Sequence, residues 1–241
     1  MLRVEAFLLG LVVTGSVIVT PFSNPATRAS GISLPQPSHR GTVTVEEALK
    51  TRRTHRSFTS RALSLQQFSQ ILWSAYGVTA KVSGYNLKTV PSAGALYPID
   101  IYAVVGYEGV ETLAPSVYHY RPEAHALEHV KDGDLRVAVA RHALRQMWMA
   151  DAPVLLVITG EYARCSVKYG GRGIIYTHIE AGHIGQSIFL QAEAMGLKAG
   201  IVGAFRNEQI IKTLGIPQEH DPLLIMPVGF PGSETRRAKS V

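Results

Sequence analysis

Residues 173–196 form the longest helical pattern in this chain, and that pattern constrains the fold more than any other feature. Small residues recur along it, at Ala181, Gly182, Gly185 and Ala192. Side chains of this size let another element approach a helix backbone closely, because interaxial distance depends on the side chains at the contact. The sequence therefore predicts a long helix that packs tightly against a second helix.

Short apolar runs between the helical patterns predict the strands of a sheet. The runs that contain residues 99–106 and 154–159 are apolar enough to be buried strands, and residues 116–120 and 126–130 flank a turn that contains proline. Residues 198–204 and 223–228 complete the predicted strands, with a helix over residues 208–214 between them. Strands interleaved with helices favour one layered α+β or α/β domain, and no internal repeat or second domain is visible.

Two capping boxes mark the starts of shorter helices before the first strand. The sequence Thr44-Val45-Glu46-Glu47 opens one helix, and Ser64-Leu65-Gln66-Gln67 opens another that ends at Gly77. In each box, the hydroxyl and the side chain three residues later satisfy backbone N–H groups at the helix start. The first helix is predicted to end in an arginine-rich segment.

Composition excludes several classes of protein. The chain has 241 residues, of which 46% are hydrophobic and 17% charged, as expected for a globular domain that buries a sizeable core. The net charge of +6 favours an anionic partner, but the basic residues form no long run, so no nucleic-acid partner is predicted. Cys165 is the single cysteine, which excludes an intrachain disulfide and a cysteine-based zinc site.

The N-terminus bears on cellular location. Residues 6–20 are apolar or small and are followed by prolines and small residues, so residues 1–29 are predicted to be a signal peptide or membrane anchor. Residues 30–43, rich in Pro, Ser and Gly, are predicted to be a linker, and residues 44–241 the folded domain. Export or tethering is slightly favoured over a cytoplasmic location.

The first chemical motif is the arginine-rich segment. Arg52, Arg53 and Arg56 place three guanidiniums within five positions, with Thr54 between them. Planar guanidiniums bind two phosphate oxygens at once, so this segment is a candidate phosphate site. If the preceding helix continues, Arg52 and Arg56 share one of its faces. A solvated helix end that favours arginine for its dipole is the alternative interpretation.

The second motif, Pro91-Ser92-Ala93-Gly94-Ala95-Leu96-Tyr97-Pro98, offers a backbone with little side chain in the way. The prolines restrict the chain and Gly94 permits unusual dihedral angles. Such a segment suits backbone hydrogen bonds to a flat ring. Together the two motifs resemble the flavin-binding elements of the nitroreductase-like FMN superfamily, and more narrowly its SagB/ThcOx-type dehydrogenase branch, over roughly residues 45–237.

The resemblance implies an α+β nitroreductase-like fold, with a central, mostly antiparallel sheet flanked by helices, in a homodimer that binds FMN at its subunit interface. It assigns the phosphate and the pyrimidine edge of the flavin to the arginine segment. It assigns the ring to the proline-flanked loop and the far side of the cofactor to more distant residues. The FMN-binding residues implied are Arg52, Arg53, Thr54, Arg56, Pro91, Ser92, Ala93, Gly94, Leu96, Val202, Gly203, Arg236 and Arg237.

The catalytic residues implied by the resemblance are Lys168 and Tyr169, which precede the long helix and its Glu180-x-Gly182-His183 stretch. Their adjacency on a Gly-rich segment, predicted to be irregular, lets both side chains point into one pocket. Tyr97 is a further candidate for lining the substrate side. The activity implied is hydride transfer between substrate and flavin N5, with azoline-to-azole oxidation on a peptide or small molecule as the reaction of this branch.

Three alternatives stay open at this stage. The first is a nitroreductase or quinone reductase that takes its electrons from NAD(P)H, and the second is a flavin-binding protein without catalysis. The third is a structural protein at a membrane surface. A Rossmann fingerprint, a Walker motif, a Gly-x-Ser-x-Gly elbow and a His-Glu-x-x-His metal motif are all absent from the sequence, so no metal site is predicted.

Overall fold

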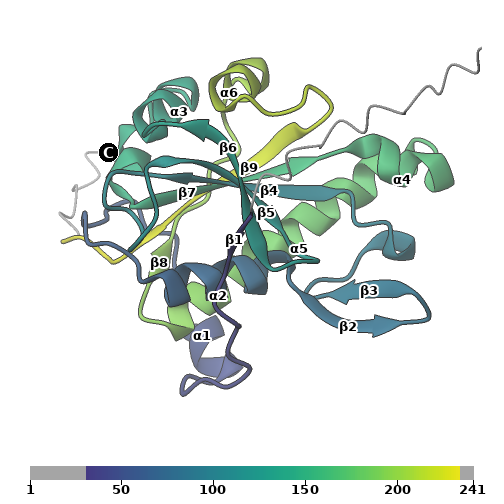
Figure 1. Cartoon of the computed structure of the whole chain (residues 1–241), viewed down its shortest axis with the longest axis horizontal. Coiled ribbons are helices and arrows are strands. Elements are labelled where there is room, and N and C mark those ends of the chain that lie inside the picture. Colours follow the sequence, from purple (N-terminus) through teal and green to yellow (C-terminus); the bar gives the residue numbers. More distant parts are fainter. Residues whose placement is uncertain (1–30, 234–241) are drawn as a thin grey trace, which may run out of the picture.

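The computed structural model describes residues 31–233, which form a seven-stranded sheet with helices on both faces (Figure 1). The strand order is β1-β6-β5-β4-β7-β9-β8, and every neighbouring pair in it is antiparallel. The strands are β1 (Ile32–Ser33), β4 (Ile99–Val105), β5 (Ser116–Arg121), β6 (Ala126–Asp132), β7 (Val154–Gly160), β8 (Lys198–Ala199) and β9 (Asp221–Gly229). The predicted α+β architecture and antiparallel sheet are confirmed.

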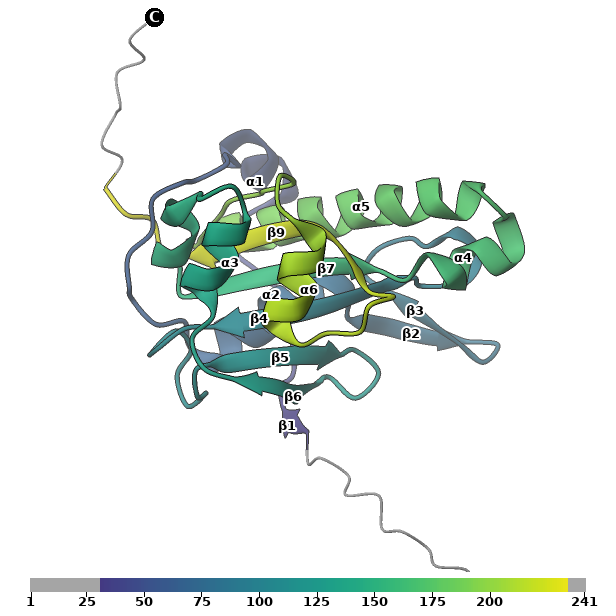
Figure 2. The same cartoon turned by 90° about the horizontal axis from the view of Figure 1, so that it is seen from above.

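The central strands β4 and β7 are buried on both faces, which explains why each appears in the sequence as a continuous apolar run. On one face, Ile101 and Leu156 pack with the helices α2 (Leu65–Tyr76) and α5 (Arg172–Ala194). On the other face, the adjacent residues Tyr102 and Leu155 pack with α3 (Arg136–His142) and α6 (Asn207–Leu214). Figure 1 shows α3 and α6 above the sheet and α2 and α5 below it, and in Figure 2, seen from above, α3 and α6 lie in front of the strands.

The predicted helix starts are confirmed at both capping boxes. Thr44 caps α1 (Val45–Thr51), with its hydroxyl accepting from Glu47 N–H while the Glu47 carboxylate accepts from Thr44 N–H. Ser64 and Gln67 cap α2 in the same way, and α2 ends at Gly77 as predicted. The long helix α5 is also confirmed, and it packs against both α1 and α2.

Helix α1 ends where the arginine segment begins, as predicted: its last residue is Thr51, and Arg52 is its extended C-cap, with φ of −50° and ψ of 122°. Arg52 and Arg56 therefore do not share a helix face. One predicted boundary is wrong. The strand predicted over residues 198–204 is only β8, followed by an isolated bridge from Val202 to Ile225. The chain leaves the sheet at Gly200, where a Cβ would stand 2.8 Å from the backbone oxygen of His55.

The predicted linker over residues 30–43 is corrected as well. Strand β1 pairs with β6 at the sheet edge, and Leu34 is buried. Beyond it, Ser38 N–H donates to the side chain of Gln70 on α2 at 2.7 Å. This stretch is therefore part of the domain surface, since its backbone donors are satisfied by the sheet and by α2. The predicted signal or anchor at residues 1–29 lies outside the described residues.

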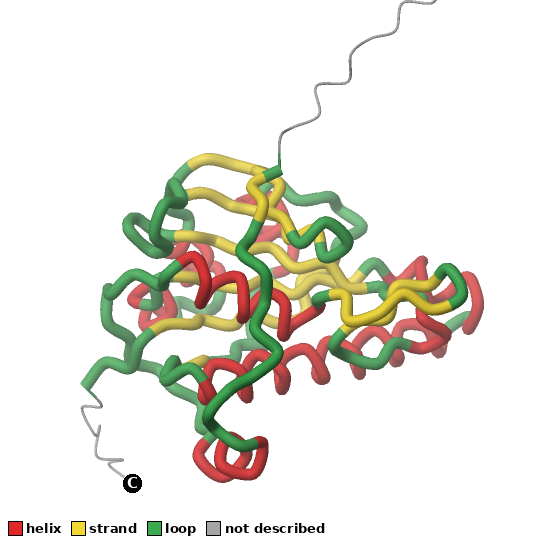
Figure 3. Tube along the Cα trace, turned by 60° about the horizontal axis from the view of Figure 1, so that its bottom comes forward, coloured by secondary structure: helices red, strands yellow, loops and turns green. Residues whose placement is uncertain are grey.

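Several elements have no counterpart in the sequence prediction. A hairpin of β2 (Val78–Val82) and β3 (Tyr85–Lys88) turns at Ser83 and Gly84, which both have positive φ. Helix α4 (Tyr162–Tyr169) precedes α5, and short 3₁₀ turns cover Ala93–Ala95 (η1) and Met147–Asp151 (η2). Figure 3 shows the hairpin projecting at the end of the domain where α4 and α5 meet. Among the described residues, no helix has the length and apolar character needed to span a membrane.

Candidate active site

The loop of residues 91–97 has an unusual backbone. Gly94, Ala95 and Tyr97 have positive φ of 60°, 54° and 49°. Such dihedrals cost energy for residues with a Cβ and are common at functional sites. Tyr97 N–H donates to the Ser92 hydroxyl at 2.9 Å, which closes the loop on itself. The loop thus combines a strained backbone with a hydrogen bond that it makes to itself.

Lys168 and Tyr169 reach this loop from α4. The sequence places them on an irregular segment, and this is wrong, because they are the last two residues of the helix. Their side chains nevertheless converge on Gly94: a Cβ there would stand 2.7 Å from Tyr169 Oη and 3.0 Å from Lys168 Nζ. Lys168 Nζ also lies 5.4 Å from the centre of the Tyr169 ring. The glycine thus leaves the space that these two polar groups occupy.

A buried carboxylate lies under the same loop. Glu180 on α5 is 1% exposed, and its Oε1 accepts a hydrogen bond of 2.7 Å from Tyr76 Oη. Burial raises the pKa of Glu180 above the usual carboxyl value, while contacts with Ser92 and Tyr76 and the charge of Lys88 oppose the rise. Glu180 helps to form a pocket of about 240 Å³, lined by Pro91, Ser92, Ala93, Tyr176, Ile179, Glu180 and His183. The sequence pattern favours a core role for Tyr76, because it occupies an apolar helical position, and gives no sign of the hydrogen bond to Glu180.

The arginine segment packs beside α5, closer to the C-terminal end of this helix than Glu180 is. The Arg52 guanidinium is 5.1 Å from the centre of the Phe189 ring, and that of Arg56 is 5.9 Å from the Trp148 ring. Arg53 turns back to donate to the backbone oxygens of Lys50 and Arg52. Among residues 31–233, none of these three arginines forms an ion pair with a carboxylate. Their charges are therefore available to an anionic ligand.

The arginine segment and the 202–203 stretch are brought together by β8. Thr54 forms a parallel bridge with Ala199, while Val202 pairs with Ile225 on β9. Gly203 is exposed, and nothing lies within 4 Å of the point where its Cβ would be. The chain also returns here at its C-terminal side, because the Ser57 hydroxyl donates to the Ser233 backbone oxygen. The predicted Arg236 and Arg237 lie outside the described residues.

The predicted cofactor residues thus form two groups on one chain. One contains the arginine segment near Phe189, and the other contains the loop near Glu180. The two contact points are nine residues apart on α5, about 14 Å at the rise of an α-helix. Leu96 belongs to neither group, because it lines a second cavity on another side of the loop.

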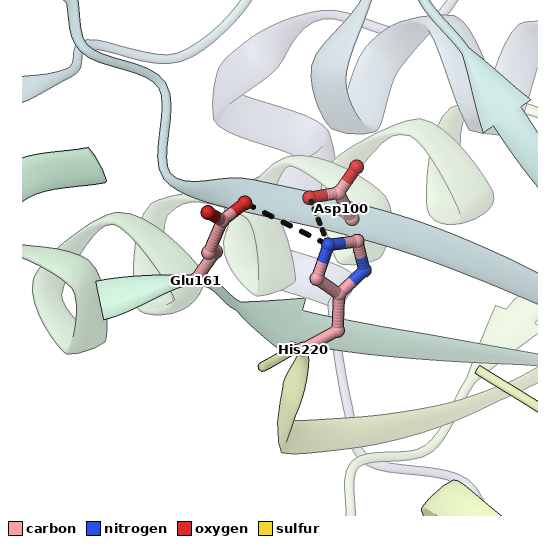
Figure 4. Close-up of side chains that lie close together, drawn as sticks. All are labelled: Asp100, Glu161 and His220. Atoms are coloured by element: carbon pink, nitrogen blue, oxygen red, sulfur yellow. Dashed lines mark ion pairs between the residues drawn. The ribbon is translucent and has the colours of Figure 1, made fainter. Parts of the chain in front are cut away.

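A polar cluster near the start of β4 is absent from the sequence prediction. Asp100, Glu161 and His220 place one ligand atom each within 4.8 Å of one another, an arrangement that could hold a metal ion (Figure 4). Arg164 already lies between the two carboxylates, with Nη2 2.8 Å from Asp100 Oδ2 and Nε 2.6 Å from Glu161 Oε2. The guanidinium supplies the positive charge that an ion would bring, so the arrangement is an ion-pair network.

This network determines the charge state of its members. Burial of Asp100 acts to raise its pKa, but the hydrogen bond with His119 and the charges of Arg164 and His220 outweigh it and hold the pKa below the usual value. The pKa of His220 is lowered, mainly by burial. His220 Nδ1 and Tyr102 Oη share a hydrogen bond of 2.7 Å. The cluster joins β4, α4 and the start of β9, which fixes the base of α4 below Lys168 and Tyr169.

Comparison with known proteins identifies the family. The model described as "Nitroreductase family" matches residues 49–230, which is most of the described fold. The chain belongs to the nitroreductase family. Both groups of candidate site residues that the structure describes lie within the matched range. Membership makes this protein an oxidoreductase, as the motifs predict.

Individual relatives agree with the assignment. A Methanocaldococcus jannaschii protein provisionally named a nitroreductase is 41% identical over 187 residues, which are 78% of this chain and 91% of that protein. The Microcin B17-processing protein McbC of Escherichia coli is 27% identical over 164 residues, or 65% of this chain. The match spans 58% of McbC.

A solved structure has the same fold. The crystal structure of a Ralstonia eutropha JMP134 protein, provisionally described as a nitroreductase, superposes with a TM-score of 0.70 at 25% identity, covering 84% of this chain and 90% of that one. The nitroreductase-like fold and the resemblance to the SagB/ThcOx-type branch are therefore confirmed, the latter through McbC.

Proposed function

We propose that this nitroreductase-family protein is an FMN-dependent dehydrogenase of the SagB/ThcOx type, with Lys168 and Tyr169 as its catalytic residues. The observation that carries the proposal is the convergence of both side chains on Gly94, in the loop that resembles a flavin-binding element. Two side chains that can exchange protons, placed beside a strained backbone loop, form the arrangement that proton removal during a dehydrogenation needs. The substrate class proposed is an azoline ring on a peptide or small molecule.

The residues present fit FMN. Arg52 and Arg56 have no carboxylate partner within the described part of the chain, so a phosphate would complete their charge balance. Pro91, Ser92 and Ala93 line a pocket with small side chains, which leaves room for a flat ring. In this proposal, the arginine segment and Gly203 hold the phosphate end, and the 91–94 loop contacts the ring. When bound, FMN would supply the site that accepts a hydride from the substrate.

The protein's own residues would manage the proton. In this proposal, deprotonated Tyr169 Oη takes the proton from the substrate carbon, and the ammonium of Lys168 stabilises the phenolate by donating a hydrogen bond. Both groups lie beside the Gly94 Cβ position. The T-shaped contact of Tyr169 with Tyr176, at 5.1 Å between ring centres, restricts where the phenol can point. Tyr76 and Glu180 support the loop from beneath, where they are closed off from water.

The proposed assembly is a homodimer. Ile175 and Ile179 on α5 are 48% and 50% exposed, and Val167 on α4 is 90% exposed. Apolar side chains grouped at one end of two adjoining helices mark an interaction surface. A second copy packed on this surface would exclude water from the pocket that Ile179 lines.

The absorption spectrum of the purified protein tests the cofactor, because bound oxidised flavin gives two visible bands. Turnover of a thiazoline-containing peptide then tests the reaction in Lys168→Ala and Tyr169→Phe. Both variants should retain flavin and lose turnover, while Lys81→Ala and Tyr107→Phe, which alter exposed residues elsewhere, should resemble the wild type. Variants that keep full turnover would refute the assigned roles, and colourless protein after incubation with excess FMN would refute the cofactor.

The principal alternative is a reductase that oxidises NAD(P)H and transfers electrons to a nitro compound or quinone. The name of the Methanocaldococcus jannaschii relative favours it. NAD(P)H oxidation measured with and without a nitroaromatic acceptor distinguishes the two, because only the reductase consumes NAD(P)H at the rate of acceptor reduction.

Export or membrane tethering through residues 1–29 is a separate proposal, which fractionation of cells that express the full-length protein would test.

A further inference from the structure

A cavity of about 380 Å³ lies beside the C-terminal part of the 91–97 loop, distinct from the pocket that Pro91 and Glu180 line. Its walls come from the β2–β3 hairpin, the start of β4, the β5–β6 turn and α4. Leu96 and Tyr97 of the loop contribute to it, whereas Lys168 and Tyr169 do not. The proposed reaction makes no use of this space.

Lys88 is the least solvated cation of the cavity. Its side chain is only 6% exposed, and its Nζ lies 3.9 Å from the centre of the Tyr76 ring and 4.9 Å from that of Tyr97. Within the described residues its carboxylate partner is Glu123, at 3.3 Å, whose side chain is 54% exposed on the β5–β6 turn. Burial lowers the pKa of Lys88, and Glu123 only partly opposes this. A buried ammonium whose counterion faces solvent gains from any further anion.

Two further hydrogen-bond donors that line the cavity near this ammonium are weakly paired or unpaired. The Asn86 side chain has no hydrogen-bond partner within residues 31–233, and Arg121 Nη1 makes only long contacts there, at 3.8 Å to Glu128 and 3.4 Å to His119 Nδ1. By contrast, both oxygens of Asp100 are already engaged, Oδ1 by His119 and Oδ2 by Arg164. A ligand that enters here therefore meets unsatisfied donors, and its complementary group is an anionic acceptor.

The rest of the cavity favours a flat ligand with an apolar body. Tyr76 and Tyr97 contribute ring surfaces, and Ala95, Leu96 and Ile99 contribute aliphatic surface. Pockets that combine apolar walls with a few convergent polar groups are typical small-molecule sites. We propose that this cavity is a second ligand site, which binds a small aromatic carboxylate with its anionic group at Lys88, Asn86 and Arg121.

The cavity shares residues with the candidate active site. Tyr97 Oη accepts a hydrogen bond from Lys88 N–H at 3.2 Å, and Tyr97 N–H donates to Ser92 in the loop. Tyr76, whose ring lies under Lys88, donates to Glu180. A carboxylate bound at Lys88 would therefore contact the residues that support the loop, although the proposal does not depend on the identity of the cofactor.

Calorimetric titration of the full-length, FMN-saturated protein with benzoate tests the proposal, and benzamide serves as the neutral probe of the same shape. Benzoate should bind, and benzamide should bind at least about tenfold more weakly, because it lacks the charge that Lys88 recognises. Lys88→Met should weaken benzoate binding by a similar factor. Lys81→Met, on the opposite strand of the same hairpin, should leave it unchanged.

Three results would overturn the proposal: no measurable binding of benzoate, equal binding of both probes, or full binding by Lys88→Met. Benzoate that alters the flavin spectrum in Lys88→Met as it does in the wild type would be bound at the flavin and would also count against it. If Lys88→Met does not fold, Arg121→Gln and Asn86→Ala replace it, since each removes an exposed or half-buried donor that the structure pairs weakly or leaves unpaired. Unchanged benzoate affinity in both would refute the site.

Discussion

The hydroxyl of Tyr169 lies 2.7 Å from the point that a Cβ on Gly94 would occupy. This relationship links the loop to α4 more directly than either motif suggests alone. We expect Gly94→Ala to destabilise the protein by about 1–2 kcal/mol, because φ is 60°, and to lower turnover by at least about tenfold, because Lys168 and Tyr169 must move. Urea unfolding and steady-state kinetics measure the two effects.

Gly196→Ala is the matched control for this variant. Gly196 has a similar φ of 68°, but nothing lies within 4 Å of its Cβ position. It should show the same loss of stability with unchanged turnover. Equal turnover in the two variants would mean that the contact of Gly94 with Tyr169 has no role in catalysis.

Local signals account for the parts of the fold that the sequence predicted. The capping boxes at Thr44 and Ser64 depend on residues three positions apart, and the central strands depend on continuous apolar runs. Helix α4 was missed because it is short and polar on average, and only Cys165 in it is fully buried. The β2–β3 hairpin was missed because both strands are short and largely exposed, although β3 alternates between exposed and half-buried positions.

The candidate site was predicted in part for a related reason. The arginine segment and the proline-flanked loop are contiguous in sequence, so both were visible. The network of Asp100, Arg164 and His220 joins residues up to 120 positions apart, and each alone looks like an ordinary surface residue. Lys88 gave no signal either, since its burial depends on the packing of Tyr76 and Tyr97 around it.

Arg56→Gln should weaken FMN binding. A charge-assisted hydrogen bond to phosphate contributes about 1.5–3 kcal/mol, so the dissociation constant should rise about 10- to 100-fold. Arg141→Gln, on an exposed position of α3, should bind FMN as the wild type does. Quenching of flavin fluorescence gives both constants, and unchanged affinity of the Arg56 variant would remove this guanidinium from the phosphate site.

Ile179→Glu should dissociate the proposed dimer. A carboxylate on this face of α5 would be buried against a second copy without a partner, which costs several kcal/mol. Leu144→Glu introduces the same charge at a residue that is 61% exposed on the opposite layer, and should leave the assembly intact. Light scattering coupled to gel filtration gives the mass of each. A dimeric Ile179→Glu variant would place the interface elsewhere.

Glu180→Gln should change how stability depends on pH. Because burial raises the pKa of Glu180 in the folded state, the folded protein holds this proton more tightly than the unfolded chain. That stabilisation is complete below the ordinary glutamate value of about 4.3 and is lost as pH rises through the folded value. Tyr76, Ser92 and Lys88 face the carboxyl group and set how far this window extends.

The stability of Glu180→Gln relative to the wild type should therefore increase as the pH is raised above this value. Urea unfolding between pH 4 and pH 7 measures it, with the exposed Glu111→Gln as a control that should follow the wild type. A constant difference between Glu180→Gln and the wild type over this range would show that Glu180 ionises as freely in the folded state as in the unfolded chain.

Asp100→Asn should be the most destabilising of these changes. It leaves Arg164 with Glu161 as its remaining carboxylate partner and removes the charge that faces His119 and His220, at a cost of about 3 kcal/mol. The pKa of Asp100 is lowered in the folded state, so its contribution is present above the unfolded value and is lost as pH falls through the folded one. The difference from wild type should thus be largest near neutral pH and shrink below about pH 4. As a control, Glu128→Gln, in an exposed pair with Arg121, should lower the free energy of unfolding by less than about 1 kcal/mol. An equally small loss for Asp100→Asn would show that the network does not fix the base of α4.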